Sequence, residues 1–152
     1  MVICSGPPQA VAREVNTNMN NTEIVQKAYE CFGNGDLPGL LELYTDDVVW
    51  TIPEVENVEY SGTRTGKPAV AEFFRLLAES EDFSHFAPTE FITQGDRVVV
   101  LGESTATIKA TGKTFSTDWV HICTVKDGKI TNFLEFFDNA AATRAFQKTL
   151  AA

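Results

Sequence analysis

A single carboxylate stands in the middle of a run of apolar and aromatic residues near the C-terminal end of the chain, in the stretch ITNFLEFFD at residues 130–138, which ends at Asp138. This carboxylate belongs to Glu135. Moving an unpaired carboxylate out of water costs several kcal/mol unless it is paired, hydrogen-bonded or protonated. Glu135 must therefore either face solvent or take part in chemistry as a proton acceptor or donor.

His121 is the best candidate partner for Glu135. The dipeptide Asp127-Gly128 is a turn signal, and it predicts that the strands on its two sides pair with residue numbers that sum to about 255. His121 then lies within a residue or so of Glu135 across the pair, where the two could share a hydrogen bond and exchange protons near neutral pH. The alternative is that both side chains face outward, as a surface or interface pair.

Tyr29 lies on the inner stripe of the first predicted helix and completes the candidate catalytic set with His121 and Glu135. The alternative is a core tyrosine with a satisfied hydroxyl. On the predicted hairpin, positions 119, 121 and 123 share a face with 133, 135 and 137, whereas Asp118 has the opposite parity and should be exposed. A mostly apolar concavity with a few polar groups is typical of a small-molecule site. The predicted ligand-binding residues, which could instead be plain core, are Trp50, Ile52, Phe74, Trp119, Phe133 and Phe137.

Two periodicities divide the chain into elements. Helical spacing of apolar residues with capping signals predicts helices at 22–32, after Asp36, at 67–79 and after a cap at Asn139. From Phe86 onward the period is two, which predicts strands at 86–93, 97–109, 113–125 and 129–138. An earlier strand is predicted at 48–52, between a turn at Asp46 and Asp47 and an exposed acidic loop at 54–62.

This order predicts an α+β fold in which helices pack on one face of a curved antiparallel sheet. Residues 22–152 should form a single domain, preceded by a loosely attached tail at 1–21. The last two strands carry apolar residues on both faces, although the few helices can cover only one. We therefore expect a homodimer that buries the other face of the sheet.

Composition excludes several classes of partner. The net charge of −9 argues against nucleic acid and anionic membranes. No apolar run approaches the roughly 18 residues that span a bilayer, and the first residues lack the features of a signal peptide. The three cysteines show no CxxC spacing and suit small thiols in a reducing cytoplasm. Neither histidine has a carboxylate or a second histidine at the sequence spacing of metal ligands, so we expect no metal. No glycine-rich nucleotide motif occurs, so we expect no cofactor.

Several segments together resemble the nuclear transport factor 2-like superfamily, in particular its SnoaL-like and ketosteroid-isomerase-like branch. The carriers are AYECFGNGDLPGLLELYTDD followed by VVWTIP, the helix GKPAVAEFF, and DGKI leading into FLEFFD. The resemblance covers about residues 22–148. It implies a cone of helices against a curved sheet that encloses a cavity, and dimerisation through the sheet in many members.

The resemblance also implies roles for individual residues. The oxyanion tyrosine of ketosteroid isomerases, a worked example of proton transfer, matches Tyr29, and their protonated aspartate falls at His121. Their aspartate base falls at Ile52, which cannot take up a proton. SnoaL-like cyclases often carry an acidic or histidine residue where Glu135 stands, whereas the arginine of limonene epoxide hydrolases has no counterpart in the last two strands.

Together these observations predict a cofactor-independent enzyme that acts by acid–base chemistry on a small or medium apolar carbonyl compound, as an isomerase, cyclase or dehydratase. A non-catalytic domain that holds an apolar ligand in the same cavity is the competing hypothesis, since fold alone does not specify function. A third is an interaction module whose cavity is filled by side chains.

Overall fold

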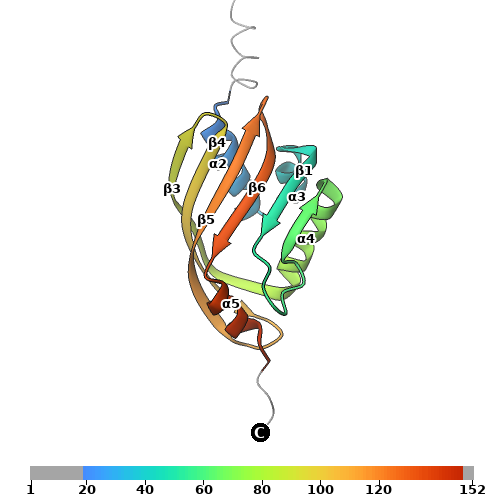
Figure 1. Cartoon of the computed structure of the whole chain (residues 1–152), viewed down its shortest axis with the longest axis vertical. Coiled ribbons are helices and arrows are strands. Elements are labelled where there is room, and N and C mark those ends of the chain that lie inside the picture. The colour runs from blue at the N-terminus through green and yellow to red at the C-terminus, as the bar shows by residue number, and fades with distance from the viewer. Residues whose placement is uncertain (1–18, 149–152) are drawn as a thin grey trace, which may run out of the picture.

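A computed structural model of the chain describes residues 19–148. Six strands form one curved sheet in the order β2-β1-β6-β5-β4-β3, and helices α2, α3 and α4 lie together on one side of it (Figure 1). The predicted α+β cone is confirmed. Most of the predicted tail, residues 1–18, lies outside the described residues, and Asn21 already belongs to the first described helix.

Two capped helices open the fold as predicted. Helix α2 (Asn21–Gly33) begins with a reciprocal cap, in which the Asn20 side chain accepts a hydrogen bond from the Glu23 N–H and the Glu23 carboxylate accepts one from the Asn20 N–H. The short helix α3 (Leu37–Glu42) begins at Asp36, whose carboxylate accepts from the backbone of the first turn. These caps hold α2 in the orientation that turns its apolar stripe to the sheet.

Strand β1 (Tyr44–Ile52) is longer than predicted and includes Asp46 and Asp47, so the expected turn at these residues was wrong. Two consecutive exposed aspartates are a common sequence signal for a turn, which explains the wrong prediction. Strand β1 pairs in parallel with β6 at Tyr44 and again from Val49 to Thr51, and Asp46 and Asp47 lie in an irregularity between these two paired stretches. On the other side, β2 (Gly62–Thr65) pairs only with the second half of β1. Pairing on both sides of the two aspartates therefore keeps the chain extended where the local signal predicts a turn.

The acidic loop at 54–62 was expected to be exposed, and this was only half right. Its acidic side chains face solvent, but Val55, Val58 and Tyr60 are buried in the core. The loop leads through β2 into helix α4 (Lys67–Ser80), which packs on β1 and contributes Val70 and Phe73 to the core. The loop thus closes one end of the cone.

The second half of the chain is the predicted antiparallel meander. Its strands are β3 (Glu81–Gln94), β4 (Arg97–Ile108), β5 (Thr114–Lys126) and β6 (Lys129–Phe137). Strand β3 begins at Glu81 rather than at 86, directly where α4 ends. The closing helix α5 (Asn139–Phe146) is capped by Asp138 rather than by Asn139, because the Asp138 carboxylate accepts from the Ala141 N–H.

A β-bulge sets the register of the last hairpin. Next to the turn, Val125 pairs with Ile130, as the predicted sum of residue numbers requires. The register then shifts at Thr131, and beyond this point His121 pairs directly with Glu135. One extra residue on β6 therefore places these two side chains on the same face of the sheet.

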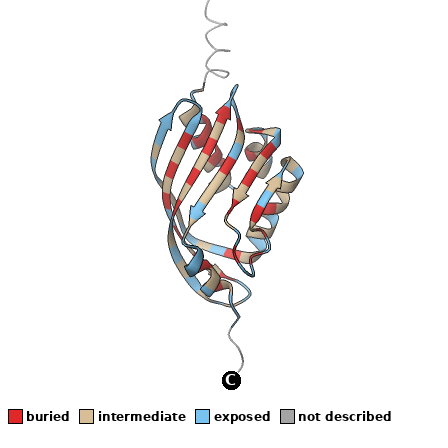
Figure 2. Ribbon diagram, viewed as in Figure 1, coloured by how far each residue is buried: buried red, intermediate tan, exposed pale blue. Residues whose placement is uncertain are grey.

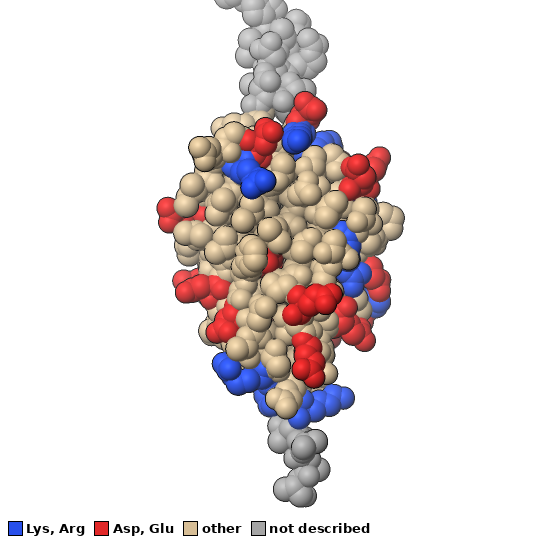
Figure 3. Space-filling view, viewed as in Figure 1, with Lys and Arg blue, Asp and Glu red and all other residues tan. Residues whose placement is uncertain are grey.

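The two faces of the sheet differ in burial (Figure 2). On β4, residues at even positions from Val98 to Ile108 are buried and their neighbours are not, as one buried face requires. On the outer face, large apolar side chains remain in contact with solvent, with Ile92 and Phe136 about half exposed. Figure 3 views this face and shows mainly uncharged residues at its centre and charged residues toward its edges.

Two further findings concern cysteines and membranes. Cys31 and Cys123 are buried free thiols, and Cys4 lies outside the described residues. No helix within residues 19–148 is long and apolar enough to cross a membrane.

Candidate functional site

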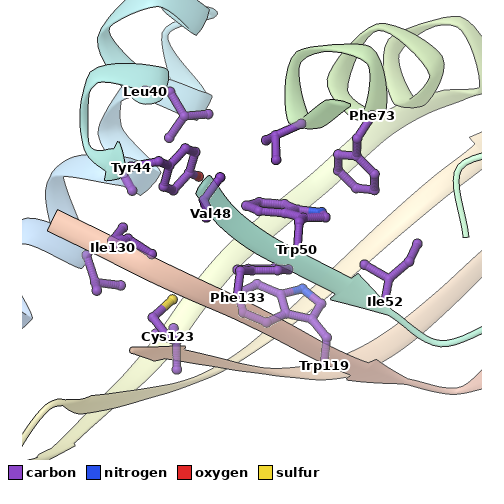
Figure 4. Packing of buried hydrophobic residues seen from close by; sticks show 14 of the residues in the cluster. Leu40, Tyr44, Val48, Trp50, Ile52, Phe73, Trp119, Cys123, Ile130 and Phe133 are labelled. Carbon is purple, nitrogen blue, oxygen red and sulfur yellow. The ribbon is translucent and has the colours of Figure 1, made fainter. Parts of the chain in front are cut away.

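A cavity of about 110 Å³ lies between the helices and the inner face of the sheet. It is lined mainly by aromatic rings, and Figure 4 shows how buried side chains from β1, β5, β6 and α4 come together beside it. The predicted residues that line it are Tyr29, Trp50, Phe74, Trp119, His121, Phe133, Glu135 and Phe137. Ile52 is buried in the core but is not among the lining residues. Asp118 is exposed, as expected.

Tyr29, His121 and Glu135 form one chain of hydrogen bonds. The Tyr29 hydroxyl lies 2.6 Å from His121 Nδ1, and His121 Nε2 lies 2.7 Å from a Glu135 oxygen. His121 is 4% exposed, and the Glu135 side chain is 17% exposed. Helix α2 and the hairpin of β5 and β6, which are distant in sequence, thus supply one connected acid–base group.

The proton positions in this chain follow from the carboxylate. An ionised Glu135 can only accept, so His121 Nε2–H donates to it. A neutral His121 then accepts from the Tyr29 hydroxyl through Nδ1. If His121 gains a second proton, Nδ1–H donates to the Tyr29 oxygen instead, and the hydroxyl proton of Tyr29 becomes free to point at a ligand. The chain can therefore store one proton and present it to the cavity.

Burial changes the pKa values of Tyr29 and of Cys123, which lies on the same face of β5 as His121. Burial raises the pKa of the Tyr29 phenol well above its ordinary value, and the negative charge of Glu135 adds to this. Burial also raises the pKa of Cys123 to about 12. Both groups are consequently protonated at neutral pH, and Tyr29 acts as a hydrogen-bond donor there.

Aromatic stacking holds the imidazole in place. The Trp119 ring stacks on His121 with centroids 4.0 Å apart, and the Tyr29 ring is parallel to the imidazole to within 4°. Trp119 in turn needs Gly102 behind it, because a Cβ at that position would come within 2.2 Å of the indole. The orientation of His121 is therefore fixed from both the helix side and the sheet side.

Sequence reasoning missed Glu81. This residue opens β3, is 7% exposed and lines the cavity. Burial raises its pKa to about 8, and the negative charge of Glu135 contributes to the shift. Glu81 stands in the polar run ESEDFSH at residues 79–85, which is typical of a loop, and no local pattern distinguishes it from the exposed acidic residues around it.

Two indole N–H groups in the cavity wall lack acceptors. Trp50 and Trp119 are both buried, and the nitrogen of neither has a hydrogen-bond partner among the described residues. A buried donor without a partner costs about 1–3 kcal/mol. Neither lysine nor arginine lines the cavity, and residues 19–148 hold no group of three or more His, Cys, Asp or Glu side chains that could bind a metal ion.

A helical lid over a curved sheet, with a buried acid–base chain in the hollow between them, is the architecture of an NTF2-like protein. The family model of the SnoaL-like domain matches residues 25–133. The chain therefore belongs to the SnoaL-like family. Among curated proteins, none matches the chain.

Solved structures agree with this assignment. An NTF2-like protein from Burkholderia xenovorans LB400 is 37% identical, with 84% of this chain and 95% of that chain covered and a TM-score of 0.77. TerC, co-crystallised with polyporic acid, is 33% identical, with 83% and 97% covered and a TM-score of 0.72. A presumed SnoaL-like polyketide cyclase from Mesorhizobium loti is 26% identical, with 78% and 99% covered and a TM-score of 0.66.

Proposed function

We propose that this protein is a cofactor-independent enzyme that moves protons on a small or medium apolar carbonyl compound, as an isomerase, cyclase or dehydratase. The observation that carries the proposal is the hydrogen-bonded chain of Tyr29, His121 and Glu135 in the wall of an aromatic cavity. A carboxylate that orients a histidine, which in turn bonds a hydroxyl, is the arrangement that activates a base in many enzymes.

The chain would work as follows. The Tyr29 oxygen accepts the proton on the carbon next to the substrate carbonyl while its own proton passes to His121 Nδ1. The imidazolium that forms is stabilised by the Glu135 carboxylate on its other side, 2.7 Å away. Tyr29 then returns a proton to the substrate, at a different carbon or at an oxygen, and recovers its own from His121. The protein ends in its starting state, so no cofactor is consumed.

Several features support the substrate class. The aromatic lining favours an apolar, flat molecule, and the two unpartnered indole N–H groups of Trp50 and Trp119 favour one that carries oxygen acceptors. TerC, one of the similar proteins, is co-crystallised with polyporic acid, which makes this compound a suitable first ligand for binding experiments.

Proton abstraction can be tested without knowing the natural substrate. The protein is incubated with 2-tetralone, a compact apolar ketone, in D₂O, and exchange of the hydrogens next to the carbonyl is followed by proton NMR. Glu135→Gln should lower the exchange rate by about 10²- to 10⁴-fold, because the imidazolium loses its carboxylate. Native mass spectrometry of the purified protein should in parallel detect any small molecule that the cavity retains.

The chain offers a matched control. His85 and Glu103 form a second histidine–glutamate pair, 2.9 Å apart, but both side chains are about half exposed and lie outside the cavity. Glu103→Gln should therefore leave exchange unchanged. If Glu135→Gln and Glu103→Gln both retain the wild-type exchange rate while ligand binding persists, the protein is a binding domain rather than an enzyme of this kind.

We also propose that a second copy of the chain covers the outer face of the sheet. Two large apolar side chains there, Ile92 and Phe136, are about half exposed, and the half-buried Val120, Ile122 and Leu134 extend the same surface. A patch of this kind with charges toward its edge is typical of an interface (Figure 3). The cavity would be unaffected, because it lies on the opposite face.

A further inference from the structure

Glu81 is a buried carboxyl group that the mechanism above does not use. It stands where α4 ends and β3 begins, and its backbone N–H closes the helix by donating to the Leu77 carbonyl. Its neighbour across the sheet is Ile108, which is fully buried. The side chain points to the inner face and lines the same cavity as Tyr29, His121 and Glu135.

A structural role for this side chain would require a partner, and the described residues provide none. Glu81 makes no side-chain hydrogen bond or ion pair within residues 19–148. Lys109 follows Ile108, the residue that pairs with Glu81 across the sheet. Its ammonium group donates to the Ala78 carbonyl and pairs with Asp82 on the exposed side. On α4, Arg75 pairs with Glu72 and Glu79 at the surface, and Lys67 pairs with Asp46 of β1.

The groups that face Glu81 across the cavity also fail to stabilise a negative charge. Those that can ionise are Tyr29, Tyr44, Tyr60, His121, Cys123 and Glu135. Burial penalises a carboxylate at this position, and the negative charge of Glu135 repels it further, so the pKa of Glu81 rises to about 8. Glu81 is therefore a neutral carboxylic acid at neutral pH, with an O–H to donate.

We propose that Glu81 is a second catalytic residue of this cavity, which donates its proton to the carbonyl oxygen of the substrate while the chain of Tyr29, His121 and Glu135 removes the carbon-bound proton. This proposal rests on the proposed function. It assigns one acid and one base to the two carboxyl groups and requires a substrate with a carbonyl oxygen next to an acidic C–H.

The protons balance in this scheme. As the C–H bond breaks, its proton goes to Tyr29 and the Tyr29 proton goes to His121, while the electron pair forms the C=C bond of an enol. The Glu81 proton forms the O–H bond of that enol and leaves a carboxylate. When the enol collapses, its O–H proton returns to Glu81 and the stored proton returns to carbon. No oxidant, reductant or co-reactant is needed.

Two measurements test this role, and both use the full chain with 2-tetralone labelled with ¹³C at the carbonyl. The first is the ¹³C shift of the bound carbonyl, which moves downfield when an acid donates to its oxygen and does not depend on turnover. The second is the pH profile of hydrogen exchange. Glu81→Gln keeps the size of the side chain, Glu81→Leu removes its polarity, and Glu90→Gln changes an exposed glutamate of the same strand as a control.

The wild-type protein and Glu90→Gln should show the downfield shift, and their exchange rates should fall above pH 8, where Glu81 ionises. Glu81→Leu should lose the shift, and both Glu81 variants should exchange at least about 10-fold more slowly without the fall at high pH. If both Glu81 variants keep the downfield ¹³C shift and the wild-type pH profile of exchange, Glu81 has no catalytic role. The proposed function still holds in that case, provided that Glu135→Gln abolishes exchange. If wild-type protein neither binds nor exchanges the ketone, both this inference and the proposed function are wrong.

Discussion

The neutral state of Glu81 makes a prediction about stability that requires no substrate. A carboxyl group whose pKa rises from 4.5 in the unfolded chain to about 8 in the folded protein binds its proton more tightly when folded. Folding stability from this group is therefore fully present below about pH 4.5 and is lost as the pH rises toward 8. Glutamine at position 81 is neutral at every pH and removes this dependence.

The size of the effect follows from the shift. Between its two pKa values, one carboxyl group changes the free energy of unfolding by about 1.4 kcal/mol per pH unit. The wild-type protein should thus lose about 2.5 kcal/mol relative to Glu81→Gln between pH 5 and pH 7, where the unfolded state is already largely ionised. Because only the difference between the two proteins is used, titration of all other groups largely cancels.

Urea unfolding followed by circular dichroism at several pH values measures this difference. Glu90→Gln is the control, and its stability should run parallel to that of the wild-type protein. A constant difference between wild type and Glu81→Gln from pH 5 to pH 8 would show that Glu81 ionises normally and would refute the reasoning. In addition, Glu135→Gln should lower the pKa of Glu81, because one of the two causes of its shift is removed.

Other predictions concern packing, capping and assembly. Gly102→Ala places a methyl group 2.2 Å from the Trp119 ring and should cost about 1–3 kcal/mol in urea unfolding, whereas Gly33→Ala, with no atom within 4 Å, should not destabilise the protein. Asn20→Ala removes the α2 cap and should lower the stability by about 1 kcal/mol, measured in the same way. Light scattering at micromolar concentration should give twice the monomer mass of 16.7 kDa, and Phe136→Glu should give the monomer mass. A wild-type monomer would contradict the proposed dimer.

Much of the fold could be predicted because each half of the chain repeats one local pattern. The stripes of α2 and α4 and the turns before β4, β5 and β6 depend on residues close in sequence, and these elements came out within a few positions. The start of strand β1 did not, because its first residue, Tyr44, pairs in parallel with Ile130 of β6, about 85 residues away. The period of apolar residues along the sequence indicates which side chains of a strand are buried, but it does not indicate which other strand pairs with it.

The candidate site shows the same division. Tyr29, His121 and Glu135 could be identified because each is a polar residue on an apolar stripe or strand. Their direct contact depends on the bulge at Thr131, which the sequence pattern does not show. Without it, His121 would pair with Leu134 and Glu135 would point to the outer face. Glu81 could not be found at all, since its burial results from the packing of α4 against the sheet rather than from its neighbours in sequence.

The parallel pairing of β1 with β6 also bears on how the protein is made. As the chain leaves the ribosome, β1 emerges early, but β6, which joins it to the rest of the sheet, emerges only after β3, β4 and β5. Until then β1 can pair only with the short strand β2, and the side of β1 that joins β6 in the folded protein is left unpaired, which favours aggregation of the nascent chain. Truncation before β6 should consequently leave an aggregation-prone fragment rather than a smaller working domain.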